Sequence, residues 1–425
     1  MKNLTLLLLT ITEKIKPLLV KFLPISLLRR VKKSLVNYYM NKLSRETKRA
    51  FFPRSANADG INLIGYIQGE IGLGQSCRLL AKSIEHAKID YTIYNYDQVS
   101  AMRFNDKSLS HKISNTTPYN INLIHIAPYE IPLAYYRLGR SLWDNRYNIA
   151  YWLWELENFP PEWENALTLA DEIWTPSEFA SASIRKITKK PVCTIPYAFS
   201  ELAPQKYSRK HFDIPDDKFL FLVMYDCNST MERKNPIGAI NAFKQAFDTK
   251  DTNVGIVIKV NNPQSKDIEI IKKELANYPC VYILADVLDK EEVNSLIACV
   301  DVYVSLHRAE GFGLVPVEAM LLGTPVISTA WSSVTEFMNN DVACMVDYEF
   351  TEIIKDCGPY KSGNRWADPN IMQAAKYMQQ LYTNKDLRIT LANKAKTHIL
   401  EHFSPNKIAA LIQNRMSEIY KGSET

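Results

Sequence analysis

The sequence predicts an α/β protein with two doubly wound domains behind a basic helical arm. Short apolar runs alternate with helical stretches, which is typical of βαβ units around a mostly parallel sheet. This alternation occurs twice, with a break at residues 200–215. The length of 425 residues suffices for two domains with full cores. Because the two doubly wound units are consecutive and similar, we expect two domains that face each other across a cleft.

The composition is that of an ordinary soluble protein, with 46% apolar and 23% charged residues. The seven cysteines are scattered, and no two have the Cys-x-x-Cys spacing of a zinc or redox motif. An odd number of scattered cysteines fits a reducing cytosol better than a disulfide framework. We therefore expect a cytoplasmic protein without bound metal.

The arm, residues 1–54, holds most of the positive charge. It carries 13 Lys and Arg against two acidic residues, whereas the remainder carries 38 basic and 44 acidic residues. Residues 4–12 are apolar but too short to span a membrane, and no signal cleavage site follows them. Between residues 27 and 39 apolar side chains recur at helical spacing, with basic ones between them. Such a helix suits an anionic membrane surface, and the alternative is a helix packed on the body or on a partner.

The first domain is expected at residues 55–203 and the second at residues 204–402, with a C-terminal helix at 403–425 that crosses back to the first domain. The strands expected in the first domain are Ile61–Ile67, Tyr91–Tyr96, Ile121–Ile126, Ile149–Trp154, Glu172–Pro176 and Val192–Pro196. Those expected in the second are Phe219–Met224, Val254–Val260, Val281–Ala285, Val300–Leu306 and Val326–Thr329. Helical stretches follow at Asn370–Leu381, Leu387–Phe403 and Asn406–Lys421.

Two glutamates, Glu310 and Glu318, bracket a glycine-rich turn between an expected strand and an expected helix. A helix N-terminus offers unpaired N–H groups and partial positive charge, which suit a phosphate. Glycines allow a ligand to approach the backbone, and the two carboxylates can accept hydrogen bonds from sugar hydroxyls. The residues expected to contact a ligand here are His307, Glu310, Gly311, Phe312, Gly313, Leu314, Val315 and Glu318.

A second loop, residues 225–236, follows the first strand of the second domain and leads into a helix that begins at Pro236. It contains Asn228, Arg233 and Lys234. Two cations at the end of a parallel strand can neutralise a diphosphate, because charge-assisted hydrogen bonds are worth about 1.5–3 kcal/mol each. The alternative is a solvated helix start.

A glycine loop also follows the first strand of the first domain. Its spacing, Gly-x-x-Gly-x-Gly, differs from the dinucleotide fingerprint, so we infer no NAD. We expect Gly72, Leu73 and Gly74 to line the cleft and Arg78, one turn into the helix, to approach a phosphate or an acidic acceptor. The alternative is a loop whose glycines serve only tight packing.

His125 ends an expected strand at the side where parallel sheets bind ligands. We expect it to contact the ligand, although a buried core histidine is the alternative. Glu155 and Glu157 end a later strand of the same sheet, where either carboxylate could accept a hydrogen bond from an acceptor hydroxyl.

These motifs together resemble those of the retaining nucleotide-sugar glycosyltransferases of family 4, which include mannosyltransferases of bacterial polysaccharide synthesis. The resemblance covers roughly residues 60–420 and implies the two-domain GT-B fold. It includes Gly-Leu-Gly at 72–74, Glu-Arg-Lys-Asn-Pro at 232–236, Glu-Gly-Phe-Gly at 310–313, and the segments at 358–360 and 366–369.

The resemblance implies a role for each site residue. Glu318 would hold the ribose, while Glu310 and His125 would hold the transferred sugar. Lys234 matches a diphosphate-binding lysine of the family. Asn228 stands where the family has an arginine, and Arg233 is expected to supply that charge.

The implied reaction transfers a hexose from a GDP- or UDP-sugar to a saccharide or lipid-linked acceptor, retaining the anomeric configuration. The chain has no Asp-x-Asp pair, with which metal-dependent glycosyltransferases hold a cation, so we expect metal independence. The nucleotide sugar is a co-substrate and no cofactor or nucleic acid is expected. Lipopolysaccharide synthesis at the inner face of the membrane is the expected setting. The alternatives are an epimerase or phosphorylase of the same fold, and a non-catalytic partner subunit.

Overall fold

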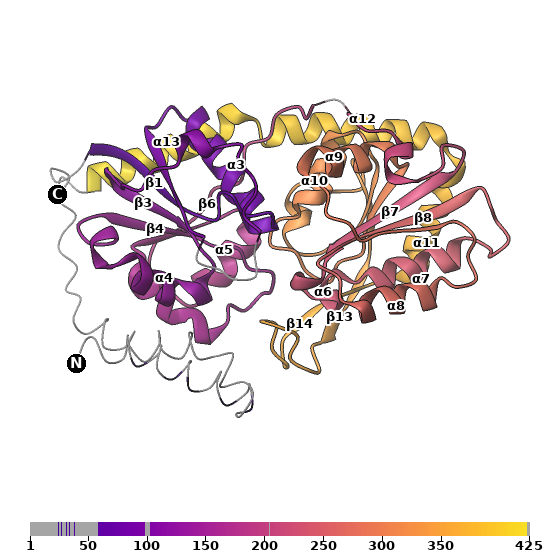
Figure 1. The fold of residues 1–425 in the computed structure, drawn as a ribbon, viewed down its shortest axis with the longest axis horizontal. Coiled ribbons are helices and arrows are strands. Elements are labelled where there is room, and N and C mark those ends of the chain that lie inside the picture. Colours follow the sequence, from indigo (N-terminus) through magenta and orange to yellow (C-terminus); the bar gives the residue numbers. More distant parts are fainter. Residues whose placement is uncertain are drawn as a thin grey trace.

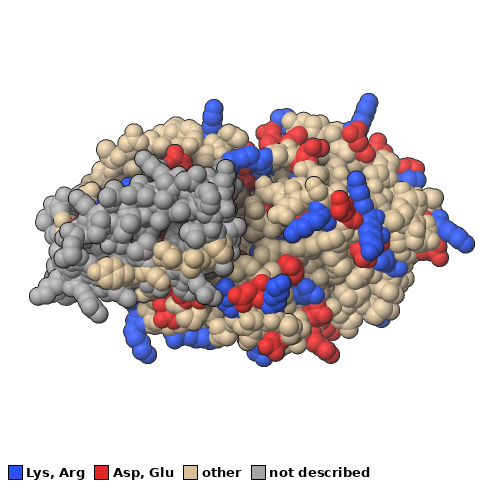
Figure 2. All heavy atoms as spheres, turned by 60° about the horizontal axis from the view of Figure 1, so that its bottom comes forward, with Lys and Arg blue, Asp and Glu red and all other residues tan. Residues whose placement is uncertain are grey.

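The computed structural model describes residues 58–97, 103–203 and 205–422, together with the isolated positions 24, 27, 31, 34 and 38. The rest of the predicted arm lies outside the described residues. Two α/β domains lie side by side along the long axis of the molecule (Figure 1). On the face drawn in Figure 2, acidic and basic side chains are interspersed over the described surface. No helix of the described ranges is long and apolar enough to cross a bilayer.

The first domain contains a six-stranded parallel sheet with the order β2-β1-β3-β4-β5-β6. Its strands are β1 (Ala58–Gly65), β2 (Tyr91–Asn95), β3 (Tyr119–His125), β4 (Tyr147–Tyr151), β5 (Glu172–Thr175) and β6 (Val192–Thr194). Its helices are α3 (Gly72–His86), α4 (Ile131–Leu138) and α5 (Glu178–Arg185). The expected strands are confirmed, with ends displaced by a few residues.

The second domain has a parallel sheet of the same size, in the order β12-β11-β10-β7-β8-β9. Its strands are β7 (Phe219–Asp226), β8 (Val254–Asn261), β9 (Val281–Leu284), β10 (Val302–Ser305), β11 (Val326–Thr329) and β12 (Cys344–Val346). Its helices are α6 (Met231–Lys234), α7 (Pro236–Ala246), α8 (Ser265–Glu274), α9 (Lys290–Cys299), α10 (Leu314–Leu321), α11 (Ile371–Thr383) and α12 (Lys385–His402). The central strands of both sheets are buried, as their near-continuous apolar sequences require, whereas the edge strands β6 and β9 are partly exposed.

An antiparallel hairpin, β13 (Tyr348–Glu352) and β14 (Arg365–Pro369), extends from the second domain beside the first (Figure 1). The sequence analysis singled out the residues of its loop and second strand without assigning them a structure. The loop closes on itself through hydrogen bonds between the backbones of Cys357 and Tyr360.

The chain ends in α13 (Pro405–Gly422), which packs on α3 of the first domain. Figure 1 shows α12 and α13 following each other along one edge of both domains. Glu172 of β5 is fully buried and accepts hydrogen bonds from Arg415 Nε at 2.7 Å and Nη2 at 2.6 Å. Tyr420 Oη accepts a hydrogen bond from the backbone N–H of Gly60 at 3.0 Å. The last helix therefore completes the core of the first domain.

Candidate active site

Charged side chains from both domains meet beyond the carboxyl ends of β4, β7 and β10. Glu310 is 9% exposed and forms an ion pair with Lys234. Arg233 Nη1 lies 3.6 Å from Glu310 Oε2, and Arg233 Nη2 lies 3.9 Å from Glu155 Oε1 of the first domain. Burial opposes ionisation of Glu310, but the charges of Lys234 and Arg233 outweigh it and lower the pKa of Glu310 to about 2. The carboxylate is therefore an acceptor at neutral pH and not a proton donor.

The two cations are held in place by the backbone around them. The short helix α6 ends at Lys234, and Asn235 follows in the left-handed region with φ +50°. The Asn235 side chain caps α7 by accepting from Gly238 N at 3.1 Å, and it donates to Leu306 O at 2.9 Å. Arg233 donates to Ala309 O at 2.8 Å. The loop after β7 is thus fixed directly against the loop after β10.

Tyr360 from the hairpin loop forms a further wall of this cluster. Its ring is 3% exposed and stacks on Trp154 with centroids 5.5 Å apart. The guanidinium carbon of Arg233 lies 5.4 Å from the Tyr360 centroid, within the range of a cation–π interaction. The sequence analysis noted this tyrosine only as part of a family segment. No spacing rule signals that a residue 127 positions away would cover Arg233.

His307 lies fully buried at the edge of the same cluster. Its Nδ1 is 3.0 Å from Ser305 Oγ. Burial is the main reason that the pKa of His307 is lowered to about 4. The ring is therefore neutral at pH 7.

The glycine turn presents the N-terminus of α10 to the space between the domains. Gly313 caps the helix with φ +98°, a conformation that favours glycine, and the first-turn residues Leu314 and Val315 are partly exposed. Ser177 of the first domain donates a hydrogen bond to Gly311 O at 2.7 Å. Phe312 is 3% exposed and packs edge-to-face on Tyr197, so its ring belongs to the core between the domains.

Glu318 lies on α10 and is 5% exposed. Its Oε1 is 2.5 Å from the Nζ of Lys290, the first residue of α9. The sequence analysis missed Lys290, because a lysine at a helix start has no distinctive signal. The ion pair holds the Glu318 carboxylate near the middle of α10.

In the first domain the glycine loop has the predicted form, and α3 begins at Gly72. A Cβ on Gly74 would lie 2.0 Å from Gly69 O, so only glycine fits there. Leu73 is partly exposed. Arg78 is 8% exposed and donates to Ile67 O and Gly69 O at 2.9 Å each. Arg78 therefore braces the glycine loop, and its contact with a ligand stays a prediction.

His125 lies inside the first domain at 1% exposure. Its Nε2 is 2.5 Å from Ser76 Oγ of α3, and its ring stacks on Tyr151. Burial lowers the pKa of His125 to about 4. Within the described ranges no hydrogen bond or ring contact joins His125 to the Glu310 cluster. Asn228 is exposed, and its backbone N–H donates to Asp226 Oδ1 at 2.8 Å. No hydrogen bond or ion pair among the described residues joins Asn228 to the Glu310 cluster.

The described part of the chain contains no group of three His, Cys, Asp or Glu residues arranged to hold a metal ion. The positive charge near Glu310 comes from Lys234, Arg233 and the α10 N-terminus.

The second domain matches a known family. Residues 205–398 match the family model described as glycosyl transferases group 1. These residues form a group 1 glycosyltransferase domain. The resemblance to retaining family 4 enzymes, stated from the motifs, is thereby confirmed.

One relative and two solved structures are similar to this chain. It is 30% identical over 159 residues to the O-antigen biosynthesis glycosyltransferase WclY of Escherichia coli, a match that spans 37% of this chain and 41% of that relative. HepE of Anabaena, solved with UDP-glucose, has a TM-score of 0.60 at 14% identity over 85% of this chain and 100% of its own. Sucrose-phosphate synthase of Thermosynechococcus elongatus has a TM-score of 0.61 at 14% identity, over 86% of this chain and 100% of its own. The expected GT-B fold is confirmed by these structures.

Proposed function

We propose that this group 1 chain is a retaining glycosyltransferase that moves a hexose from a nucleoside diphosphate sugar to a saccharide or lipid-linked acceptor in cell-surface polysaccharide synthesis. One observation carries the proposal: Lys234, Arg233 and Glu310 converge beside the N-terminus of α10, which also bears Glu318. Cations and free N–H groups suit a diphosphate, and ionised carboxylates suit the hydroxyls of ribose and sugar.

In this proposal the chemistry depends on the departing diphosphate. Lys234, Arg233 and the first-turn N–H groups of Leu314 and Val315 stabilise the charge that develops as the glycosidic bond breaks. Glu310, ionised because its pKa is about 2, accepts hydrogen bonds from the transferred sugar. Glu318 accepts from the ribose. No metal is needed, because these groups supply the positive charge.

The first domain supplies the sugar side of the site. At the start of α3, Gly72 is exposed with open space where a Cβ would lie, so a sugar can approach its backbone closely beside the partly exposed Leu73. Gly74 lets this turn close against Gly69. His125 contacts Ser76 of α3 from inside the domain, so we assign it the role of positioning the start of α3. His307 remains a neutral hydrogen-bonding group beside Glu310.

The donor base is open between uridine and guanosine. HepE was solved with UDP-glucose and TarM of Staphylococcus aureus with UDP, so uridine nucleotides are the first to test. A thermal-shift panel of UDP-glucose, GDP-mannose and dTDP-glucose tests the proposal, because a ligand that binds only the folded state stabilises it by mass action. One nucleotide class should raise the melting temperature. The absence of a shift with all three would overturn the proposal.

A further inference from the structure

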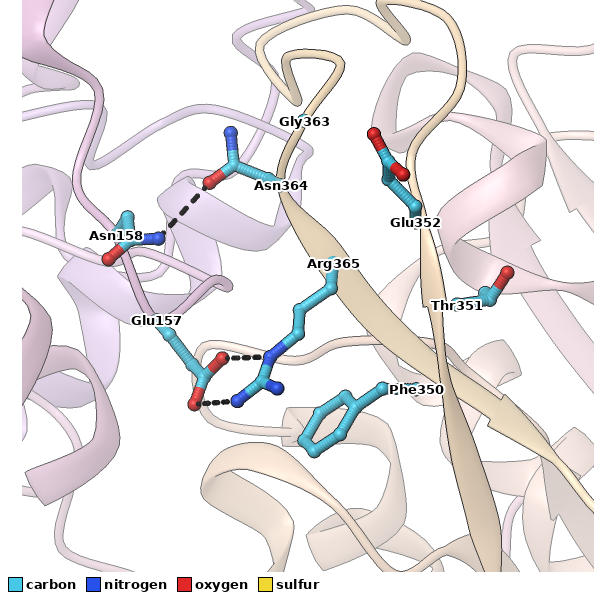
Figure 3. A pocket seen from close by; sticks show the side chains of 8 residues that line it. All are labelled: Glu157, Asn158, Phe350, Thr351, Glu352, Gly363, Asn364 and Arg365. Atoms are coloured by element: carbon cyan, nitrogen blue, oxygen red, sulfur yellow. Dashed lines mark hydrogen bonds and ion pairs between the residues drawn. The ribbon is translucent and has the colours of Figure 1, made fainter.

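A pocket lies between the hairpin and the segment after β4 (Figure 3). Its volume is about 370 Å³, within the range of roughly 300–1,000 Å³ typical of small-molecule sites. Two residues come from the first domain and six from the hairpin. The lining residues are Glu157, Asn158, Phe350, Thr351, Glu352, Gly363, Asn364 and Arg365.

The pocket joins the two domains through charged and amide groups. Arg365 donates to both carboxylate oxygens of Glu157, at 2.8 and 3.2 Å, and Asn158 donates to Asn364 Oδ1 at 3.4 Å (Figure 3). The guanidinium carbon of Arg365 lies 3.9 Å from the centroid of Phe350, whose side chain is 43% exposed. The walls are therefore ordered before a ligand arrives.

The first-domain wall is held rigidly by its backbone. The carbonyl of Glu157 accepts from Lys186 Nζ at 2.6 Å, and that of Asn158 accepts from Trp154 Nε1 at 2.8 Å. Across the pocket, the side chains of Thr351 and Glu352 have no hydrogen-bond or ion-pair partner among the described residues. They remain available to a ligand.

The chemistry of the walls favours a neutral polyhydroxylated ligand. Carboxylates accept, guanidinium groups donate, and amides do both, so together they satisfy hydroxyls that are donors and acceptors at once. An anion is disfavoured, because Arg365 is the one cation that lines the pocket, is already paired with Glu157, and has Glu352 opposite it in the hairpin. The exposed ring of Phe350 offers an apolar edge.

The pocket shares two chain segments with the donor cluster. In the segment after β4, Glu155 approaches Arg233 while Glu157 lines the pocket. In the hairpin loop, Tyr360 covers Arg233 while Asn364 lines the pocket. The same two chain segments therefore border both the donor cluster and the pocket, so an acceptor bound next to the transferred sugar would lie close to the pocket.

We propose that this pocket binds a sugar unit of the acceptor, one that flanks the unit carrying the reacting hydroxyl. The role as an acceptor subsite rests on the proposed transferase function, whereas saccharide binding is measurable by itself. Since both domains line the pocket, a bound saccharide also holds them together.

The test uses saturation-transfer NMR on the full chain with the neutral disaccharides maltose, cellobiose, lactose and α-mannobiose, with UDP or GDP present to fill the donor site. At least one disaccharide should give a signal. Glu352→Ala and Asn158→Ala should each weaken its binding by about tenfold, as the loss of hydrogen bonds to charged or polar groups predicts. Glu349→Ala is the matched control, because Glu349 is an exposed glutamate of the same strand that does not line the pocket.

No signal from any of the four disaccharides, or equal signals from all variants, would overturn the pocket assignment. Calorimetry with UDP and GDP on the same samples separates this result from the proposed function. Nucleotide binding without a saccharide signal rejects the pocket alone. A variant-sensitive saccharide signal without nucleotide binding rejects the donor assignment and keeps the pocket.

Discussion

The ammonium group of Lys290 lies 2.5 Å from the carboxylate of Glu318, which is almost fully buried. A buried carboxylate is stable as an anion only when a partner compensates its lost hydration. Lys290 supplies that partner from the neighbouring helix α9. The ion pair therefore contributes to the stability of the second domain and also positions the carboxylate that is proposed to bind the ribose.

Glu318→Ala should weaken binding of the nucleotide sugar by roughly 10- to 150-fold, the equivalent of about 1.5–3 kcal/mol for hydrogen bonds to a charged group. Calorimetric titration measures the change. Lys290→Ala is the informative companion, because it should lower the melting temperature while leaving Glu318 in place. Wild-type affinity in Glu318→Ala would remove the ribose assignment.

Lys234→Ala should weaken binding of the nucleoside diphosphate more than binding of the nucleoside, because the lost contact is with phosphate. Titrating UDP and uridine, or their guanosine counterparts, gives the two affinities. Lys244→Ala on α7, whose lysine pairs with Glu274, is the matched control. An equal loss for both ligands would show that Lys234 supports the fold and does not bind the diphosphate.

Transferase turnover should persist in excess EDTA, because Lys234, Arg233 and the α10 N-terminus neutralise the diphosphate in our proposal. Product formation with and without the chelator measures this. A strict requirement for manganese or magnesium would contradict the proposed way of holding the leaving group.

Folding stability should fall as the pH drops from about 6.5 to about 4. His125 and His307 are buried neutral with pKa values of about 4, whereas an unfolded histidine titrates near 6.5, so unfolding takes up protons in this window. Each histidine adds a slope of about 1.4 kcal/mol per pH unit. His125→Gln should flatten the profile measured by denaturant unfolding, with His111→Gln on the surface as control. The same slope in all three proteins would refute the assignment.

The arm should attach the protein to anionic membranes, because residues 1–54 carry 13 basic and two acidic residues. The described face in Figure 2 mixes both signs, so it offers no competing basic surface there. At about 1 kcal/mol per basic residue near the lipid, a few contacts suffice for reversible binding. Deleting residues 1–50 should abolish sedimentation with phosphatidylserine vesicles and leave nucleotide binding unchanged. High salt should mimic the deletion. Full-length protein that ignores such vesicles at low salt would reject the membrane role.

Patterns within single segments predicted most of the fold. Apolar runs predicted all the strands of the first sheet and all of the second except β12, which was missed. Pro236 marked the start of α7, because proline suits a first helical position. The hairpin β13–β14 was missed, since its strands are partly exposed and lack the continuous apolar run by which the strands of the two parallel sheets were recognised.

The candidate site was predictable where chemistry sits in one loop, as with Glu310 and the glycines of the same turn. Tyr360 and Lys290 could not be found this way, because each approaches its partner only after distant segments fold together. For His125 the local pattern located the strand end but not the partner of the side chain. A strand end that faces the ligand side still places this side chain under α3.

The position of α13 has a consequence for how the protein is made. The strands of the first domain are synthesised first, yet the arginine that compensates its buried Glu172 is residue 415 and is synthesised only after the strands of the second domain. The second domain, synthesised later, already has all its strands by then, so it can complete its core first. Until α13 has been synthesised, the nascent first domain exposes the surface of α3 on which α13 packs, so a premature stop near residue 404 would damage the first domain and not the second.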